Sequence, residues 1–159
     1  MSERRMLQSV SKRRPACTTL GAMPFTPWTP LAPLHDLVLL AVRLVTGVVM
    51  VHYGWPKIRD PAGHVRDFAA TGFKPVALWA TVILVVEFFG GLAMLMGLYT
   101  WVAAALFGFE MATGAVWKIA KAGKPFTDYS YDLELLALCL VLLAFGPGAC
   151  SLDHAFAAR

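Results

Sequence analysis

Four ionisable side chains stand inside long apolar stretches of this sequence: Arg43, Glu87, Glu110 and Glu134. Between Ala77 and Gly97, for example, Glu87 is the only residue that ionises. A charge at the centre of a membrane costs about 2.5 to 3.5 kcal/mol on insertion scales, so each group needs a partner, a proton or water. Residues of this kind carry protons, bind a polar ligand or form structural ion pairs.

Helix geometry predicts that the four charges lie in one layer. If Leu98 and Tyr99 form the middle of a turn, Glu87 and Glu110 are each 11 or 12 residues away from it. At 1.5 Å per residue, that distance is roughly 17 Å, close to the midplane of a membrane. The same count puts Arg43 roughly 12 Å deep and Glu134 roughly 18 Å deep. Gly47, Gly90 and Gly91 follow these charges by about one turn, where small residues allow helices to approach closely.

The charges in this layer do not balance. One arginine cannot neutralise three carboxylates in a low-dielectric layer, so we predict that at least one glutamate is protonated near neutral pH, with Glu87 and Glu110 sharing a proton. Such a network is either a proton-linked, ligand-binding or redox-related site, or an ion-pair network that only fixes helix packing. His52 and Lys57, at the end of the first apolar run, are the candidates for the mouth of a pocket.

The elements that must position these residues are membrane helices. With 58% hydrophobic and 15% charged residues, the chain is too apolar for an ordinary soluble globule. Runs of about 20 apolar residues recur, as a helix crossing a bilayer requires. We therefore predict an all-α membrane domain over residues 35–153, a bundle of four transmembrane helices. The predicted spans are residues 35–53, 76–98, 100–117 and 131–145.

The loop between the first two spans has the start and stop signals of a helix. In "DPAGHVRDFAATG", Asp60 is placed to cap a helix, Pro61 suits its first position and Gly72 ends it. We predict a short amphipathic helix on the membrane surface, with a solvated loop as the alternative.

Outside the membrane domain the sequence predicts two tails. Residues 1–34 are basic and proline-rich and indicate a disordered tail, within which Met23 is an alternative start; residues 154–159 form the C-terminal tail. The tail charges precede the first span and favour both termini in the cytoplasm. The three cysteines lack the spacing of a metal site, and no nucleic-acid-binding fold accompanies the basic tail.

Three segments of the chain resemble a known family. "RLVTGVVMVHYGWPK", "EFFGGLAMLMGLYT" and "YDLELLALCLVLLAFGPGACSLD" occur in the order and spacing of the DoxX family of small bacterial membrane proteins, and the resemblance spans about Leu37 to Asp153. It implies a multi-pass protein of the bacterial inner (plasma) membrane. The residues at family-pattern positions are Arg43, His52, Gly54, Lys57, Glu87, Gly90, Gly91, Gly97, Glu134, Gly146, Pro147, Gly148 and Asp153.

The resemblance also implies a functional setting. DoxX-like proteins are associated with membrane redox systems, among them a thiosulfate:quinone oxidoreductase, and with thiol and superoxide detoxification. The chain has no flavin, haem or iron–sulfur motif. We therefore expect at most a membrane subunit of an oxidoreductase system, with no intrinsic cofactor and a quinone as candidate ligand. Arg43, Glu87 and Glu134 would line its pocket, with Glu110 as a further proton carrier.

The partners expected on this reading are the lipid bilayer, soluble redox or detoxification proteins, and a second copy of the chain. The alternative is a non-catalytic membrane scaffold, chaperone or assembly factor, in which the buried charges are structural.

Overall fold

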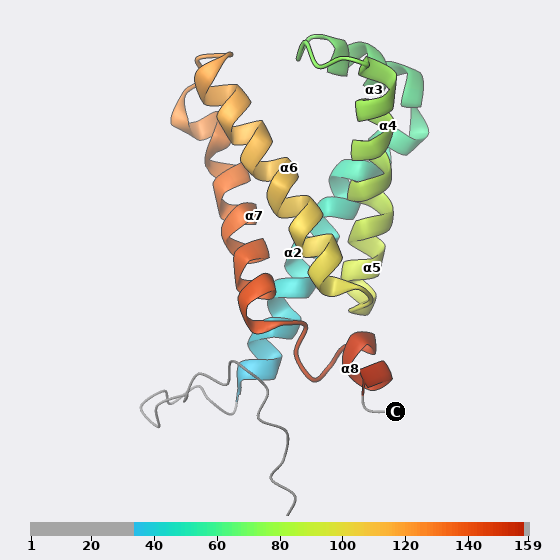
Figure 1. Ribbon diagram of the computed structural model, residues 1–159, viewed down its shortest axis with the longest axis vertical. Helices are drawn as coiled ribbons and strands as arrows, with labels where there is room; N and C mark the ends of the chain where they lie inside the picture. Colours follow the sequence, from blue (N-terminus) through green and yellow to red (C-terminus); the bar gives the residue numbers. More distant parts are fainter. Residues whose placement is uncertain (1–33, 158–159) are drawn as a thin grey trace, which may run out of the picture. The chain divides into compact units, whose positions relative to one another are not determined.

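A computed structural model describes residues 34–157 of the chain (Figure 1). The tail predicted for residues 1–34, with Met23, lies outside the described residues except for Leu34, as do the last two residues. Within residues 34–157 every regular element is a helix and no strand occurs, which confirms the all-α fold. The elements are α2 (His35–Arg59), α3 (Pro61–Ala69), α4 (Val76–Val85), the π-helix η2 (Val86–Gly90), α5 (Gly91–Met96), α6 (Thr100–Ala120), α7 (Phe126–Phe145) and α8 (Leu152–Ala157).

The first half of the bundle is a helical hairpin. Helix α2 packs against the continuous helical segment α4–η2–α5, with α3 between them in sequence. Helix α2 continues through Pro56 to Arg59 rather than ending at Tyr53. Helix α3 starts where the sequence predicts, because the Asp60 carboxylate caps it by accepting the N–H of Gly63 at 2.9 Å.

The second half is the hairpin of α6 and α7, which make the most extensive helix contact in the described chain. Buried apolar side chains join this hairpin to the first one. They are Leu39 and Met50 of α2, Met94 of α5, Ala103, Ala104, Phe107 and Met111 of α6, and Leu135, Cys139 and Leu142 of α7.

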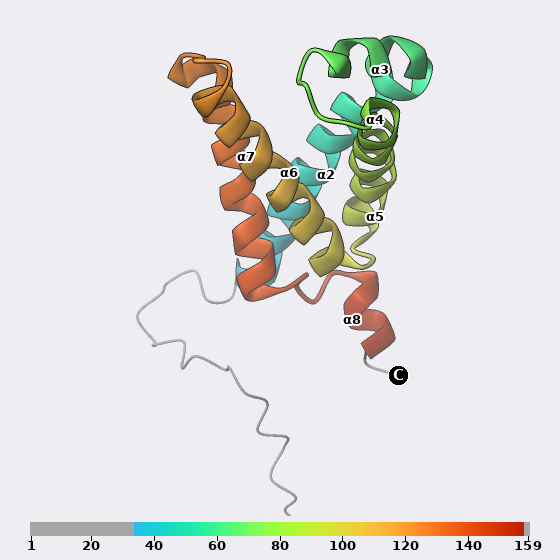
Figure 2. The same ribbon diagram turned by 45° about the horizontal axis from the view of Figure 1, so that its top comes forward.

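The two hairpins are joined most directly at one end, while at the other end Trp117 Nε1 of α6 donates to the carbonyl oxygen of Thr71 at 3.0 Å. Gly97 adopts the left-handed conformation (φ 68°) that ends α5, and the chain turns directly into α6. The Asp153 carboxylate accepts the N–H groups of Tyr99 and Thr100 at 2.7 and 2.8 Å, so the first turn of α8 caps the start of α6. At the other end α3 and α4 separate from the α6–α7 turn, as Figures 1 and 2 both show.

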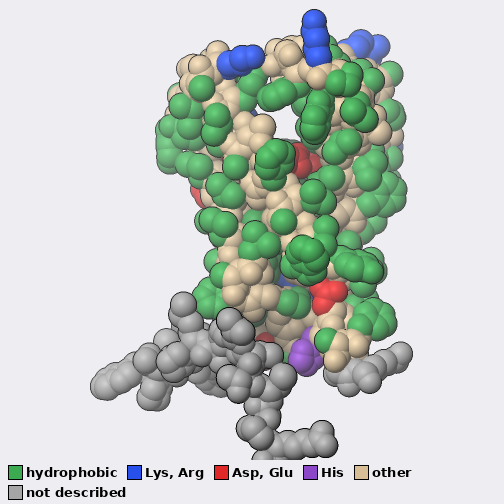
Figure 3. All heavy atoms as spheres, in the orientation of Figure 1, with side chains coloured by type: hydrophobic (Ala, Val, Ile, Leu, Met, Phe, Trp, Pro, Cys, Tyr) green, Lys and Arg blue, Asp and Glu red, His purple; other side chains and the backbone are tan. Residues whose placement is uncertain are grey.

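Three helices of the described residues are long and apolar enough to cross a membrane: His35–Arg59, Val76–Met96 and Thr100–Ala120. Exposed apolar side chains cover much of the visible outer surface, as lipid contact requires (Figure 3). Helix α7 has 20 residues but includes three acidic ones, Asp128, Asp132 and Glu134. Its crossing of the membrane therefore stays a prediction.

Candidate functional site

A cavity of about 630 Å³ lies between the two hairpins, on the side where they diverge. Its volume is within the range of pockets for small molecules and cofactors, and most of its lining is apolar. Figure 3 shows the molecule hollowed near this end, with an acidic side chain at the edge of the hollow. The polar residues of the lining are Tyr53, Lys57, His64, Thr71, Glu87, Glu110, Thr113, Lys118, Tyr131 and Asp132.

On the wall formed by the first hairpin, Lys57 pairs with Glu87. The Lys57 ammonium donates a hydrogen bond to Oε2 of Glu87, whose residue is only 5% exposed. Gly54, one turn before Lys57, makes this reach possible because a Cβ there would lie 2.8 Å from the backbone nitrogen of Phe88. The pair is therefore formed where α2 and η2 lie backbone to backbone.

Glu87 belongs to a π-helical turn within an otherwise α-helical segment. The sequence predicts an unbroken helix here and gives no sign of this turn. A π-turn contains one more residue than an α-turn and is frequent at functional sites. The extra residue rotates α5 relative to α4 about the helix axis. As a result Glu87 lines the cavity while Gly91 and Met94, in α5, remain buried.

Glu110, on α6, lines the same cavity as Glu87, which is on η2. The two carboxyl groups are close enough to interact electrostatically, and the sharing of one proton between them stays a prediction. No described residue donates a hydrogen bond to the buried Oε2 atom of Glu110. The structure thus brings to one cavity the two glutamates that the sequence pairs, and one oxygen of Glu110 is buried there without a donor.

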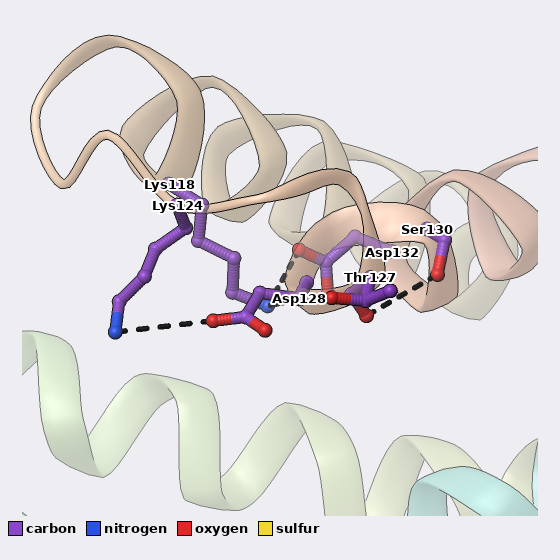
Figure 4. Close-up of polar contacts among 6 residues, drawn as sticks. All are labelled: Lys118, Lys124, Thr127, Asp128, Ser130 and Asp132. Atoms are coloured by element: carbon purple, nitrogen blue, oxygen red, sulfur yellow. Dashed lines mark hydrogen bonds and ion pairs between the residues drawn. The ribbon is translucent and has the colours of Figure 1, made fainter.

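A second lysine–carboxylate pair lies on the wall formed by the second hairpin. Lys118 Nζ of α6 donates to Oδ2 of Asp132 of α7 at 2.7 Å (Figure 4). Asp132 is as buried as Glu87, at 5% exposure. Neither residue is among the candidates predicted from the sequence, because both stand at the edges of the third and fourth predicted spans. In the structure Asp132 lies one and two turns before Leu135 and Cys139, on the buried face of α7.

The mouth of the cavity is formed by Lys57 with His64, not with His52. His52 is exposed, packs edge-on against Tyr53 and does not line the cavity. His64, on α3, has its Nε2 atom 3.1 Å from the carbonyl oxygen of Ala80. Burial, together with the nearby charge of Lys57, lowers the pKa of His64, so its imidazole is neutral at pH 7.

Arg43 does not reach the cavity. It is buried, but its guanidinium donates to the carbonyl oxygen of Cys150 and lies against Gly97, at the end where the two hairpins are joined most directly. The depth estimate counts backbone rise only, whereas a helical side chain slants toward the N-terminus of its helix. The long arginine therefore ends nearer the membrane face than its backbone does.

Glu134 does not reach the cavity either, because it is exposed on the outside of α7. It follows Asp132 by two residues, or about 200° around the helix, so only one of the two can face inward. The four charges predicted to lie in one layer are therefore divided: Glu87 and Glu110 meet, and the other two stand apart.

A known protein family matches the part of the chain that runs from α2 to α6. The sequence profile of the DoxX family matches residues 38–119, just over half of the chain. The chain belongs to the DoxX family. This DoxX protein is 32% identical over 124 residues to inner membrane protein YqjF of Escherichia coli K12, covering 76% of this chain and 93% of YqjF. It is 27% identical over 127 residues to inner membrane protein YphA of the same organism, covering 76% of this chain and 91% of YphA.

A further relative of this DoxX protein comes from Bacillus subtilis 168. It bears the name "Putative oxidoreductase CatD" and is 28% identical over 106 residues, covering 65% of this chain and 76% of CatD. No solved structure matches this DoxX protein. Together, the family, the inner-membrane relatives and the apolar helices identify a multi-pass protein of the bacterial inner membrane.

Proposed function

We propose that this DoxX protein is the membrane component of a redox system and that its cavity binds the head group of a quinone. The main support is the cavity itself, which is mostly apolar, of suitable size, and lined by two lysine–carboxylate pairs and by Glu110. The relationship to a protein whose name contains "oxidoreductase" adds support of a coarser kind.

In this proposal the residues of the cavity form hydrogen bonds to the quinone and transfer protons to it. A quinone that is reduced to a quinol accepts two electrons and two protons. In this proposal a soluble partner protein supplies the electrons. Lys57 donates a hydrogen bond to a quinone oxygen, the carboxyl pair Glu87–Glu110 delivers one proton to the ring, and the second proton comes from water that enters the cavity.

The rival proposal is a scaffold or assembly factor whose ion pairs only hold the helices. One observation favours it: each pair joins two helices of the same hairpin, α2 with η2 and α6 with α7. Against it stands the position of Glu110, which has a buried oxygen without a donor and gains nothing from a purely structural role. The scaffold also predicts that substitutions on the exposed connections between the long helices, such as Arg66→Ala on α3, impair function more than substitutions at Glu87.

Quinone binding can be measured through the tryptophans of the cavity. Trp79 and Trp117 both line it, and a bound quinone quenches their fluorescence. We expect saturable quenching when decylubiquinone is titrated into the purified protein in nanodiscs. The Trp79→Phe/Trp117→Phe variant should lose most of that saturable signal.

The matched comparison is between two glutamates given the same substitution. Glu110→Gln removes the acidic proton donor of the cavity, and we expect it to weaken binding about tenfold, the effect of losing one hydrogen bond. Glu134→Gln changes an exposed glutamate and should leave binding unchanged. The proposal fails if the wild type shows no saturable quenching, or if both substitutions have the same effect.

A further inference from the structure

The two hairpins present the same chemical arrangement to one cavity. In each hairpin, the last part of the first helix provides a lysine and the second helix provides a buried carboxylate. The first pair is Lys57 with Glu87 and the second is Lys118 with Asp132. Glu110 interacts electrostatically with both carboxylates and with Lys57, so the two pairs act on one shared space.

Each pair keeps its lysine accessible from the cavity. The side chains of Lys57 and Lys118 are 23% and 31% exposed, whereas their carboxylate partners are almost fully buried. An ammonium group has three N–H donors. Lys118 uses one on Asp132 and one on the carbonyl oxygen of Asp128, 3.2 Å away, which leaves a donor for a ligand.

A neighbouring ion pair shows what a purely surface pair looks like in this chain. Lys124 and Asp128 are 3.8 Å apart, both largely exposed, and neither lines the cavity (Figure 4). An exposed pair of this kind contributes little to stability, whereas burying Asp132 requires that its charge be compensated. Helices α6 and α7 already share an extensive apolar interface, so holding them together does not require a buried pair.

We propose that Lys118 is a second donor to the bound molecule, which therefore carries two hydrogen-bond acceptors, one directed at each hairpin. The charges of the two pairs cancel, and Glu110 adds no positive charge, so the cavity offers no excess positive charge to a phosphate or a carboxylate. The structure therefore favours an uncharged ring with two carbonyl groups. This inference rests on the proposed function and specifies which of its ligands fit.

The test compares two competitors with identical tails, one with two acceptors and one with a single acceptor. A decyl-substituted 1,4-naphthoquinone and a decyl-substituted 1-tetralone are each used to displace decylubiquinone from the protein in nanodiscs. The double variant Lys118→Met/Asp132→Asn removes the second pair without leaving an unpaired charge. We expect the affinity for the diketone to fall about tenfold in this variant and that for the monoketone to stay unchanged. The control Lys124→Met/Asp128→Asn should keep the wild-type preference.

A second measurement uses the wild-type protein and so does not depend on the variant folding. Bound diketone should slow the acetylation of Lys118 by acetic anhydride relative to Lys124, as measured by mass spectrometry, and the monoketone should not. An unchanged preference in the double variant, an equal loss of both ligands, or unaltered acetylation of Lys118 would overturn this inference while leaving quinone binding intact. Absence of quinone binding by the wild type would instead refute the proposed function.

Discussion

Replacing Gly91 with alanine tests whether backbone contact between α2 and α5 holds the first hairpin together. A Cβ at position 91 would lie 2.8 Å from Cγ2 of Val51, 2.9 Å from its backbone nitrogen and 3.1 Å from the carbonyl oxygen of Gly47. Two of these three atoms belong to the backbone and cannot rotate away. The helices must therefore separate, and Lys57 and Glu87 separate with them.

The magnitude follows from comparison with Gly108, which is also in a helix. A Cβ at Gly108 has no neighbour closer than 3.6 Å. Both substitutions gain about 0.8 to 1 kcal/mol from the helix preference of alanine, so that gain cancels in the comparison. Overpacking costs about 1 to 3 kcal/mol, and contact with backbone puts Gly91→Ala at the upper end. We expect it to be about 3 kcal/mol less stable than Gly108→Ala, roughly 100-fold in the unfolding equilibrium.

Steric trapping of both variants in bicelles measures this difference directly. The protein unfolds reversibly in that assay without denaturant, so the lipid environment is the same for both. Equal stability of Gly91→Ala and Gly108→Ala would refute the argument, because it would mean that α2 and α5 are not in contact at this position.

Three further outcomes are expected. Asp153→Ala removes the cap from two backbone N–H groups of α6 and should cost about 1 to 2 kcal/mol in the same trapping assay; an unchanged value would mean that water replaces the cap. Gly97→Ala forces a side chain into a left-handed turn beside the Arg43 guanidinium and should cost at least about 1 to 2 kcal/mol, measured in the same way, whereas Gly123→Ala adds only the strain of the turn. Because the pKa of His64 is lowered, the unfolded chain binds its proton more readily, so stability should fall as the pH drops below about 6.5. His64→Gln should remove that part of the fall, as judged from thermal unfolding at pH 8 and pH 5.5.

The sequence is informative where a local rule decides the structure. Asp60 and Pro61 mark the start of α3 through cap chemistry, and the turn predicted at Leu98 and Tyr99 is found between α5 and α6. The pairing of Glu87 with Glu110 also follows from counting residues along two helices on either side of a short turn. Each of these inferences needs only spacing along one or two adjacent elements.

The partners of the buried charges could not be predicted in that way. Helix α7 is apolar on nearly all sides, so periodicity does not tell whether Asp132 or Glu134 faces the core. That choice depends on how α7 is rotated against α6. In the same way, Lys57 reaches Glu87 only because Gly54 lets two backbones meet, and Arg43 turns away toward a carbonyl group more than a hundred residues later in the chain. These are tertiary contacts that spacing does not encode.

The π-turn at Val86–Gly90 constrains how this segment can vary between related chains. Deleting one residue there would restore an α-turn and rotate one side of the helix by about 100° relative to the other, with a shift of about 1.5 Å. Either Glu87 would leave the cavity or Gly91 would leave its contact with α2. A relative that lacks one residue between this glutamate and the second glycine therefore has a different site, even if every other residue of the cavity is identical. The length of this segment is as much a part of the site as the residues within it.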